Sequence, residues 1–112
     1  MHEIWLGTDL DRLPTVKAMG NAFTQDSGSN KVGVIVTKTG IPVALTGTVK
    51  GFVILPNGAT IEASGSRENN KAWVVLPDSA LANPGHIGVY VKLIGENTVT
   101  LGGVEGYVYK SM

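Results

Sequence analysis

The chain has 112 residues and carries nine basic and nine acidic side chains, so its formal net charge is zero. This length is typical of one domain. The scattered, balanced charge argues against nucleic-acid binding, which needs basic clusters to neutralise phosphates, and against anchoring on an anionic membrane. The absence of cysteine excludes disulfides, thiolate metal sites and cysteine nucleophiles, and no apolar stretch approaches the roughly 20 residues of a membrane-spanning helix.

The composition favours β-structure. Charged residues make up 16% of the chain, and glycine is frequent at 15 residues. An average soluble domain has roughly 25% charged residues. Such a weakly charged, Gly- and Val-rich chain suggests strands and a surface partly covered by neighbours. The opening segment MHEIWLGTDLDR lacks a basic region, so we expect no signal peptide.

We expect the chain to divide into an extended N-terminal arm, residues 1–14, and a single β-sandwich domain, residues 15–112. The arm packs either on its own domain or on a neighbouring molecule. Its apolar residues form the predicted interface: Ile4, Trp5, Leu6, Leu10 and Leu13. Trp5 is the expected anchor, because aromatic residues carry a large share of the energy of an interface.

The first half of the domain predicts a strand and a hairpin. After an exposed loop, the segment Lys31–Lys38 is dense in β-branched residues and places its valines on one face of a strand. The segment Thr48–Leu55 is apolar on both faces near its end. It is followed by Pro56–Gly58, in which Asn-Gly favours a type I′ turn, and by a return strand over Ala59–Gly65.

The second half predicts three more strands and one helical turn. The strands are expected over Lys71–Pro77, His86–Ile94 and Thr98–Lys110. Between the first two, the segment Asp78–Gly85 predicts a single helical turn capped by Asp78. Short strands with turn signals every 8–12 residues or so are typical of an antiparallel β-sandwich.

One catalytic set can be assembled from the sequence. Asp78, Ser79 and His86 could form a hydrolytic triad, but Ser79 lies in the helix-cap turn without the strand-to-helix elbow that exposes a nucleophile. We therefore interpret His86 as a residue at the start of a strand.

Two aspartates have the alternating spacing of oxygen ligands. Asp9 and Asp11 could contribute to a calcium site, but no further ligand follows at the spacing of a calcium loop. The favoured interpretation is turn formation and pairing with Arg12.

Glycoside hydrolysis needs two carboxylates about 5–10 Å apart. The sequence marks no such pair among its glutamates in strands and turns: Glu62, Glu68, Glu96 and Glu105. We expect no enzyme, no cofactor and no metal site.

The aromatic residues offer an alternative function. Trp73 is flanked by small and β-branched apolar residues, and we expect it in the core. Tyr107 and Tyr109 share one face of the last strand and are candidates for an exposed aromatic patch. Such a patch could stack on a sugar, so a carbohydrate-binding adhesion module is the alternative of another class.

The order of motifs resembles the N-terminal domain of the phage baseplate upper protein family. The resemblance begins at Thr15–Gly40, with a strand, a polar loop and a long apolar strand. It continues through Ile41–Gly58, where Pro-Val-x-Leu-Thr-Gly precedes a strand and a Pro-x-Gly hairpin. It ends in Lys71–Gly95, with a strand, a Leu-Pro turn, a helical turn and a returning strand.

The resemblance implies an immunoglobulin-like antiparallel β-sandwich that attaches host-adhesion machinery to the virion. The expected partners are other virion proteins and further copies of the chain, as trimers, with host glycans engaged only indirectly. The expected location is the virion, assembled in the bacterial cytoplasm. Capsid decoration or a head-fibre role for the same fold is the alternative, because this chain ends without the helical or fibrous region that follows in the family.

Overall fold

The computed structural model describes residues 2–12, 14–24 and 30–109, and it describes side chains in these ranges except at 2 and 19–24. The described chain is all-β, with two short 3-10 turns, η1 (Leu10–Arg12) and η2 (Asp78–Leu81). Its strands are β1 (His2–Asp9), β2 (Thr15–Thr24), β3 (Asn30–Lys38), β4 (Ile41–Pro42), β5 (Thr48–Ile54), β6 (Thr60–Glu68), β7 (Lys71–Val75), β8 (Gly85–Ile94) and β9 (Thr98–Tyr109). No helix of the described chain is long and apolar enough to span a membrane.

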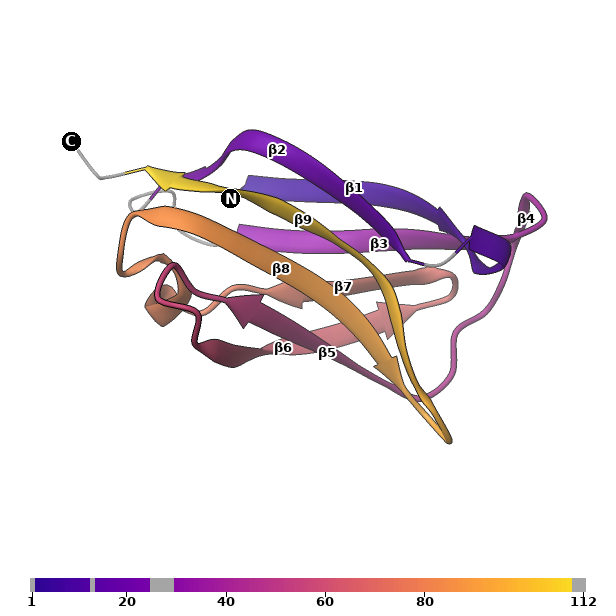
Figure 1. Ribbon diagram of the computed structural model, residues 1–112. Helices are drawn as coiled ribbons and strands as arrows, with labels where there is room; N and C mark the ends of the chain where they lie inside the picture. The colour runs from indigo at the N-terminus through magenta and orange to yellow at the C-terminus, as the bar shows by residue number, and fades with distance from the viewer. Residues whose placement is uncertain (1, 13, 25–29, 110–112) are drawn as a thin grey trace.

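The strands form one continuous sheet that rolls into a nearly closed barrel (Figure 1). The strand order is β1-β3-β7-β6-β5-β8-β9-β2, and β4 pairs with β3. The two end strands return to each other, where the hydroxyl oxygens of Thr8 and Thr15 lie 2.9 Å apart. The expected immunoglobulin-like sandwich of two antiparallel sheets is therefore not confirmed. The outermost pairs, β1 with β3 and β2 with β9, are also parallel.

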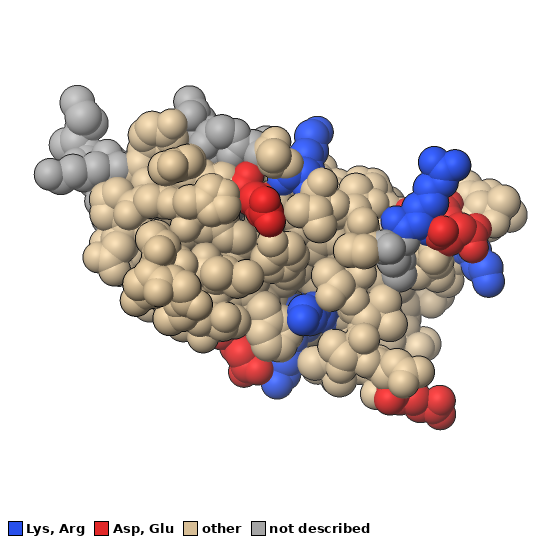
Figure 2. Space-filling view, in the orientation of Figure 1, with Lys and Arg blue, Asp and Glu red and all other residues tan. Residues whose placement is uncertain are grey.

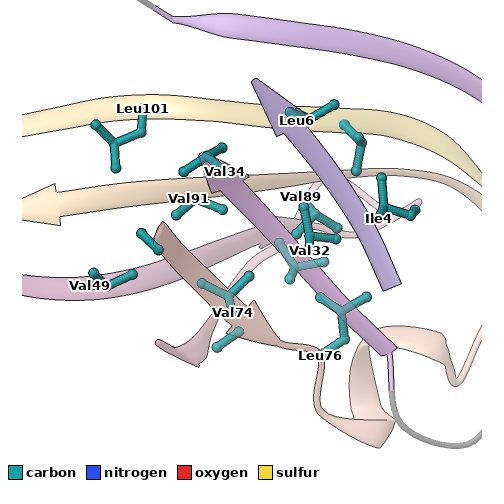
Figure 3. Close-up of a cluster of buried hydrophobic side chains, with 14 of the residues drawn as sticks. Ile4, Leu6, Val32, Val34, Val49, Val74, Leu76, Val89, Val91 and Leu101 are labelled. Carbon is teal, nitrogen blue, oxygen red and sulfur yellow. The ribbon is translucent and has the colours of Figure 1, made fainter. Parts of the chain in front are cut away.

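Alternating side chains explain why these segments form strands around a core. In β3, three fully buried valines point inward, Val32, Val34 and Val36, as the sequence predicts. Figure 3 shows Val32 and Val34 facing valines and leucines from the opposite wall, such as Val89 and Leu101. Burying one side chain of this kind contributes about 1.5–3 kcal/mol relative to leaving it exposed. The core thus holds the barrel closed without any disulfide.

The N-terminal segment is part of the barrel, so the expected extended arm is not confirmed. β1 pairs with β3 over its whole length, from His2 opposite Asn30 to Asp9 opposite Thr37. The physical reason is its two-residue alternation: Ile4, Leu6 and Thr8 point inward and are buried, whereas Trp5 points outward.

Two turns differ from their predicted forms. The hairpin between β5 and β6 is present, but only Gly58 has a positive φ (88°), so the turn is not of type I′. Asn57 instead accepts a hydrogen bond from the Ala59 amide at 2.9 Å through its side chain. In η2, Asp78 lies in the first turn, and the N-cap position is Pro77 without a side-chain cap bond.

Trp73 is not a core residue. Its neighbours Ala72 and Val74 are fully buried on the inner face of β7, so Trp73 projects to the outer face and is only half-buried. In a run of apolar residues on a strand, successive side chains therefore point alternately to the inner and the outer face of the sheet.

Candidate functional site

The candidate hydrolytic residues lie on two elements, η2 and β8, and form no hydrogen bond with one another among the described side chains. Asp78 and Ser79 are exposed on η2, and His86 lies near the start of β8. The His86 ring contacts Tyr107 edge to face, with ring centroids 5.7 Å apart.

The Asp9 carboxylate connects the turn after β3 to the end of β1 through hydrogen bonds. It accepts hydrogen bonds from the backbone amides of Asp11, Thr39 and Gly40 at 3.0, 3.2 and 3.0 Å, and from the Thr37 hydroxyl at 3.0 Å. Because these donors favour the charged form, they hold the pKa of Asp9 well below its usual range, with the Asp11 and Gly40 amides contributing most.

The same arrangement decides the role of the two aspartates. Asp11 accepts a hydrogen bond from the Thr39 hydroxyl at 2.8 Å, so both carboxylates connect η1 to the β3–β4 turn. Within the described ranges, no group of three acidic or histidine side chains could hold a metal ion. The turn-forming interpretation fits this geometry, although the partners of Asp9 do not include Arg12. Charged side chains of both signs gather at this end of the molecule, which carries η1 and β4 (Figure 2).

Of the predicted interface residues that the structure describes, only Trp5 is exposed on the surface. Ile4 and Leu6 are buried in the core, and Leu10 packs partly buried against it. Leu13 lies outside the described residues. Trp5 is 36% exposed.

The Trp5 ring lies flat on the outer face of β3 over Gly33. A Cβ atom added at Gly33 would lie 2.4 Å from Trp5 Cζ3, so the ring occupies the space of the missing side chain. The Trp73 ring follows on β7, with ring centroids 6.2 Å apart, and Lys31 Nζ lies 5.4 Å from the Trp73 centroid. The Trp5 indole donates a hydrogen bond to Glu3 Oε1 at 3.0 Å.

Two exposed aliphatic residues extend this surface. Ile35 follows Gly33 by two positions on β3, and Val75 follows Trp73 by two positions on β7, so both point outward with the rings. We call the surface made by Trp5, Trp73, Ile35 and Val75 the tryptophan face.

A second aromatic surface lies on the outer side of β5, β8 and β9. Tyr90 on β8 lies across two glycines: a Cβ atom at Gly88 would lie 2.9 Å from Tyr90 Cε2, and one at Gly103 would lie 2.7 Å from Cδ1. The hydroxyl donates a hydrogen bond to Glu105 Oε1 at 2.6 Å. This bond, with burial and the charge of Glu105, raises the pKa of Tyr90 to about 12.

Tyr90 separates two open grooves. The larger, of about 380 Å³, is lined by Pro14, Val16, Phe52, Ile54, Thr60, Tyr90, Lys92 and Thr100. In it, Lys92 Nζ lies 4.9 Å from the Phe52 ring centroid. The other, of about 300 Å³, includes Ile54, Tyr90, His86 and Glu105 in its lining. We call this surface, centred on Tyr90, the tyrosine face. The face shown in Figure 2 is mostly uncharged away from the η1 end and carries only a few charged side chains there.

Tyr107 and Tyr109 are exposed at the end of β9, with ring centroids 6.3 Å apart. Their use as a binding patch stays a prediction. The tyrosine face itself was missed in the sequence, although glycines inside strands can mark positions where another group approaches the backbone closely. The other glutamates are exposed, and Glu62 forms an ion pair with Lys50 at 3.7 Å.

Comparison with known proteins places the fold. No protein-family model matches the sequence, and no curated protein matches it. Among solved structures, the N-terminal domain of phage TP901-1 ORF48 is similar, with a TM-score of 0.52 and 13% sequence identity. The similarity covers 100% of both chains. The chain therefore shares its fold, over its full length, with the N-terminal domain of a phage protein.

Proposed function

We propose that this chain is a non-enzymatic structural module of a phage virion that supports host adhesion as part of the baseplate or tail. The observation that carries the proposal is the fold shared with the ORF48 domain over both full lengths. ORF48 is a baseplate protein. The resemblance of the sequence motifs to the baseplate upper protein family supports the same assignment.

The tryptophan face is the surface we assign to contact with other virion proteins. It combines two indole rings with Ile35 and Val75, which are 37% and 42% exposed. Exposed apolar side chains on one surface can mark protein contacts, and tryptophan is enriched among the residues that dominate binding energy. The partner is a virion protein or another copy of the chain, and we propose trimers, as in the family.

Immunogold electron microscopy tests the location. Antibody against the chain is applied to phage particles induced from the host that carries its gene. Gold at the tail tip supports the baseplate proposal, whereas gold on the capsid replaces it with the decoration or head-fibre role. Particles without gold would overturn the virion assignment.

A further inference from the structure

We propose that the tyrosine face binds a neutral saccharide, with one pyranose ring stacked on Tyr90 and its neighbours in the two adjacent grooves. The proposal does not rest on the virion assignment. It rests on the placement of the Tyr90 ring and on the groups that surround it.

Tyr90 is a flat platform because the backbone beneath it carries no side chains. The ring spans from Gly88 on its own strand to Gly103 on β9, which is directly opposite Tyr90 in the strand register. One ring face therefore rests on the sheet. The ring borders both grooves, so ligands on either side can reach it.

The platform is fixed before any ligand arrives. The hydroxyl donates to Glu105 Oε1 at 2.6 Å, and the backbone below leaves no room for a Cβ atom. A ligand that stacks on Tyr90 does not have to immobilise the ring, and a preorganised surface costs less binding free energy.

The chemistry around the ring suits a sugar. A pyranose presents C–H groups on its face, which pack on an aromatic ring, and hydroxyls at its edge, which need donors and acceptors. The larger groove supplies Thr60, Thr100 and Lys92, and the smaller supplies His86 and the Glu105 carboxylate. Ligand sites commonly combine an apolar floor with a few polar groups of this kind.

The charges favour a neutral ligand over an anion or a cation. Each groove contains one residue of fixed charge, Lys92 in the larger and Glu105 in the smaller. Both are already engaged, since Lys92 lies over the Phe52 ring and Glu105 accepts the Tyr90 hydroxyl. A polyol can bond to both groups without requiring net charge.

The test is a titration of the full ¹⁵N-labelled chain, followed by NMR. The probes are methyl β-glucopyranoside, methyl β-galactopyranoside, N-acetylglucosamine and cellotriose. We expect at least one to shift amides of β5, β8 and β9 with a Kd on the order of 1–10 mM. Because grooves lie on both sides of Tyr90, cellotriose should bind more tightly than methyl β-glucopyranoside.

Variants locate the contact. Tyr90→Leu should weaken binding by about two- to tenfold, the range of one aromatic contact. Tyr90→Phe keeps the ring and should retain most of the affinity. This variant also provides a comparison with the wild type if Tyr90→Leu does not fold. Trp5→Ala, on the tryptophan face, is the matched control and should leave binding unchanged.

Three outcomes would overturn the proposal. They are no shift with any probe up to about 50 mM, shifts confined to another face, and affinity unaffected by Tyr90→Leu. Because no phage particle is needed, the result is independent of the immunogold experiment.

Discussion

The tryptophan and tyrosine faces share one packing arrangement and differ in the residues around it. In each, an aromatic ring lies over a glycine and fills the space of the missing side chain. Trp5 does so from an end strand, β1, beside exposed Ile35 and Val75, whereas Tyr90 does so from the interior strand β8, held by Glu105 and bordered by grooves. The difference lies in what surrounds each ring: Ile35 and Val75, with Glu3 and Lys31, share the tryptophan face, whereas open grooves with polar lining residues border Tyr90. We expect the first surroundings to suit a protein and the second to suit a small polar ligand.

The largest expected effect is the loss of stability when a side chain on the inner side of β1 is shortened. Leu6→Ala should lower the free energy of unfolding by about 2–5 kcal/mol, because it leaves a cavity in the core. Urea denaturation measures the loss. A variant as stable as the wild type would contradict the placement of β1 in the barrel and restore the arm.

Trp5→Ala, one residue away on the outer face, should act on binding. If the tryptophan face is the protein interface, the variant should weaken association with purified phage particles by about 2 kcal/mol or more, or roughly thirtyfold. Co-sedimentation of the labelled chain with particles that lack it provides the measurement. Tyr107→Ala is the control for loss of an exposed aromatic ring. Equal binding by both variants and the wild type would remove the tryptophan face from the proposal.

Two glycine substitutions compare how much stability is lost when a Cβ atom is added beneath Tyr90 and beneath Trp5. A Cβ atom at Gly103 would lie 2.5 Å from the Val89 carbonyl oxygen, so Gly103→Ala must move backbone and should cost about 1–3 kcal/mol. At Gly33 the atoms in the way belong to the Trp5 side chain, which can swing aside, so Gly33→Ala should cost less. Thermal or urea unfolding ranks the pair. If Gly33→Ala cost more stability than Gly103→Ala, the Trp5 ring would be held too rigidly to move aside.

The Tyr90 hydroxyl gives a pH-dependent signal. Its folded-state pKa of about 12 lies above the ordinary value of 10.0, so its contribution to stability is present below pH 10 and is lost as the pH rises towards 12. The difference in absorbance near 295 nm between the wild type and Tyr90→Phe follows its ionisation. Glu105→Ala, which removes the acceptor, should move this ionisation to lower pH, and an unchanged titration would contradict the contact with Glu105 as its cause.

The smallest expected effect belongs to Asp9. Its pKa is lowered in the folded state, so its contribution to stability is full above the ordinary value of 3.8 and is lost as the pH falls further. Asp9→Asn should therefore be less stable than the wild type at neutral pH, and the gap should narrow as the pH falls from about 4 to about 2. Unfolding curves across this range measure the gap. A constant gap would show that hydrogen-bond geometry, and not charge, provides the stabilisation.

The sequence predicts local periodicity well. The inward valines of β3 and the β5–β6 hairpin follow from two-residue alternation and from an Asn-Gly turn. The same alternation is present at Ile4 and Leu6, in the segment expected to be an extended arm and not a strand. It could not indicate the partner, because parallel pairing with β3 depends on residues that are distant in the sequence.

The tyrosine face depends on register and could not be predicted. Tyr90 meets Gly103 and Glu105 only because β8 and β9 pair in one alignment, which shifts between Val91 and Lys92. A slip by one residue would turn every side chain of β9 to the opposite face. Neither propensity nor spacing encodes that alignment, so a tyrosine in a strand gives no sign of a platform.

The parallel pairing of β2 with β9 has a consequence for synthesis. Thr15 lies opposite Gly102, so β2 leaves the ribosome well before its partner strand, which lies near the end of the described chain. Chains emerge at about 5–20 residues per second, so β2 waits seconds with an unpaired edge while the hairpins of the middle strands form. Contacts so distant in sequence also form slowly. During this interval β2 is open to other strands, including β9 of another copy, and a high local concentration of chains would favour such exchange.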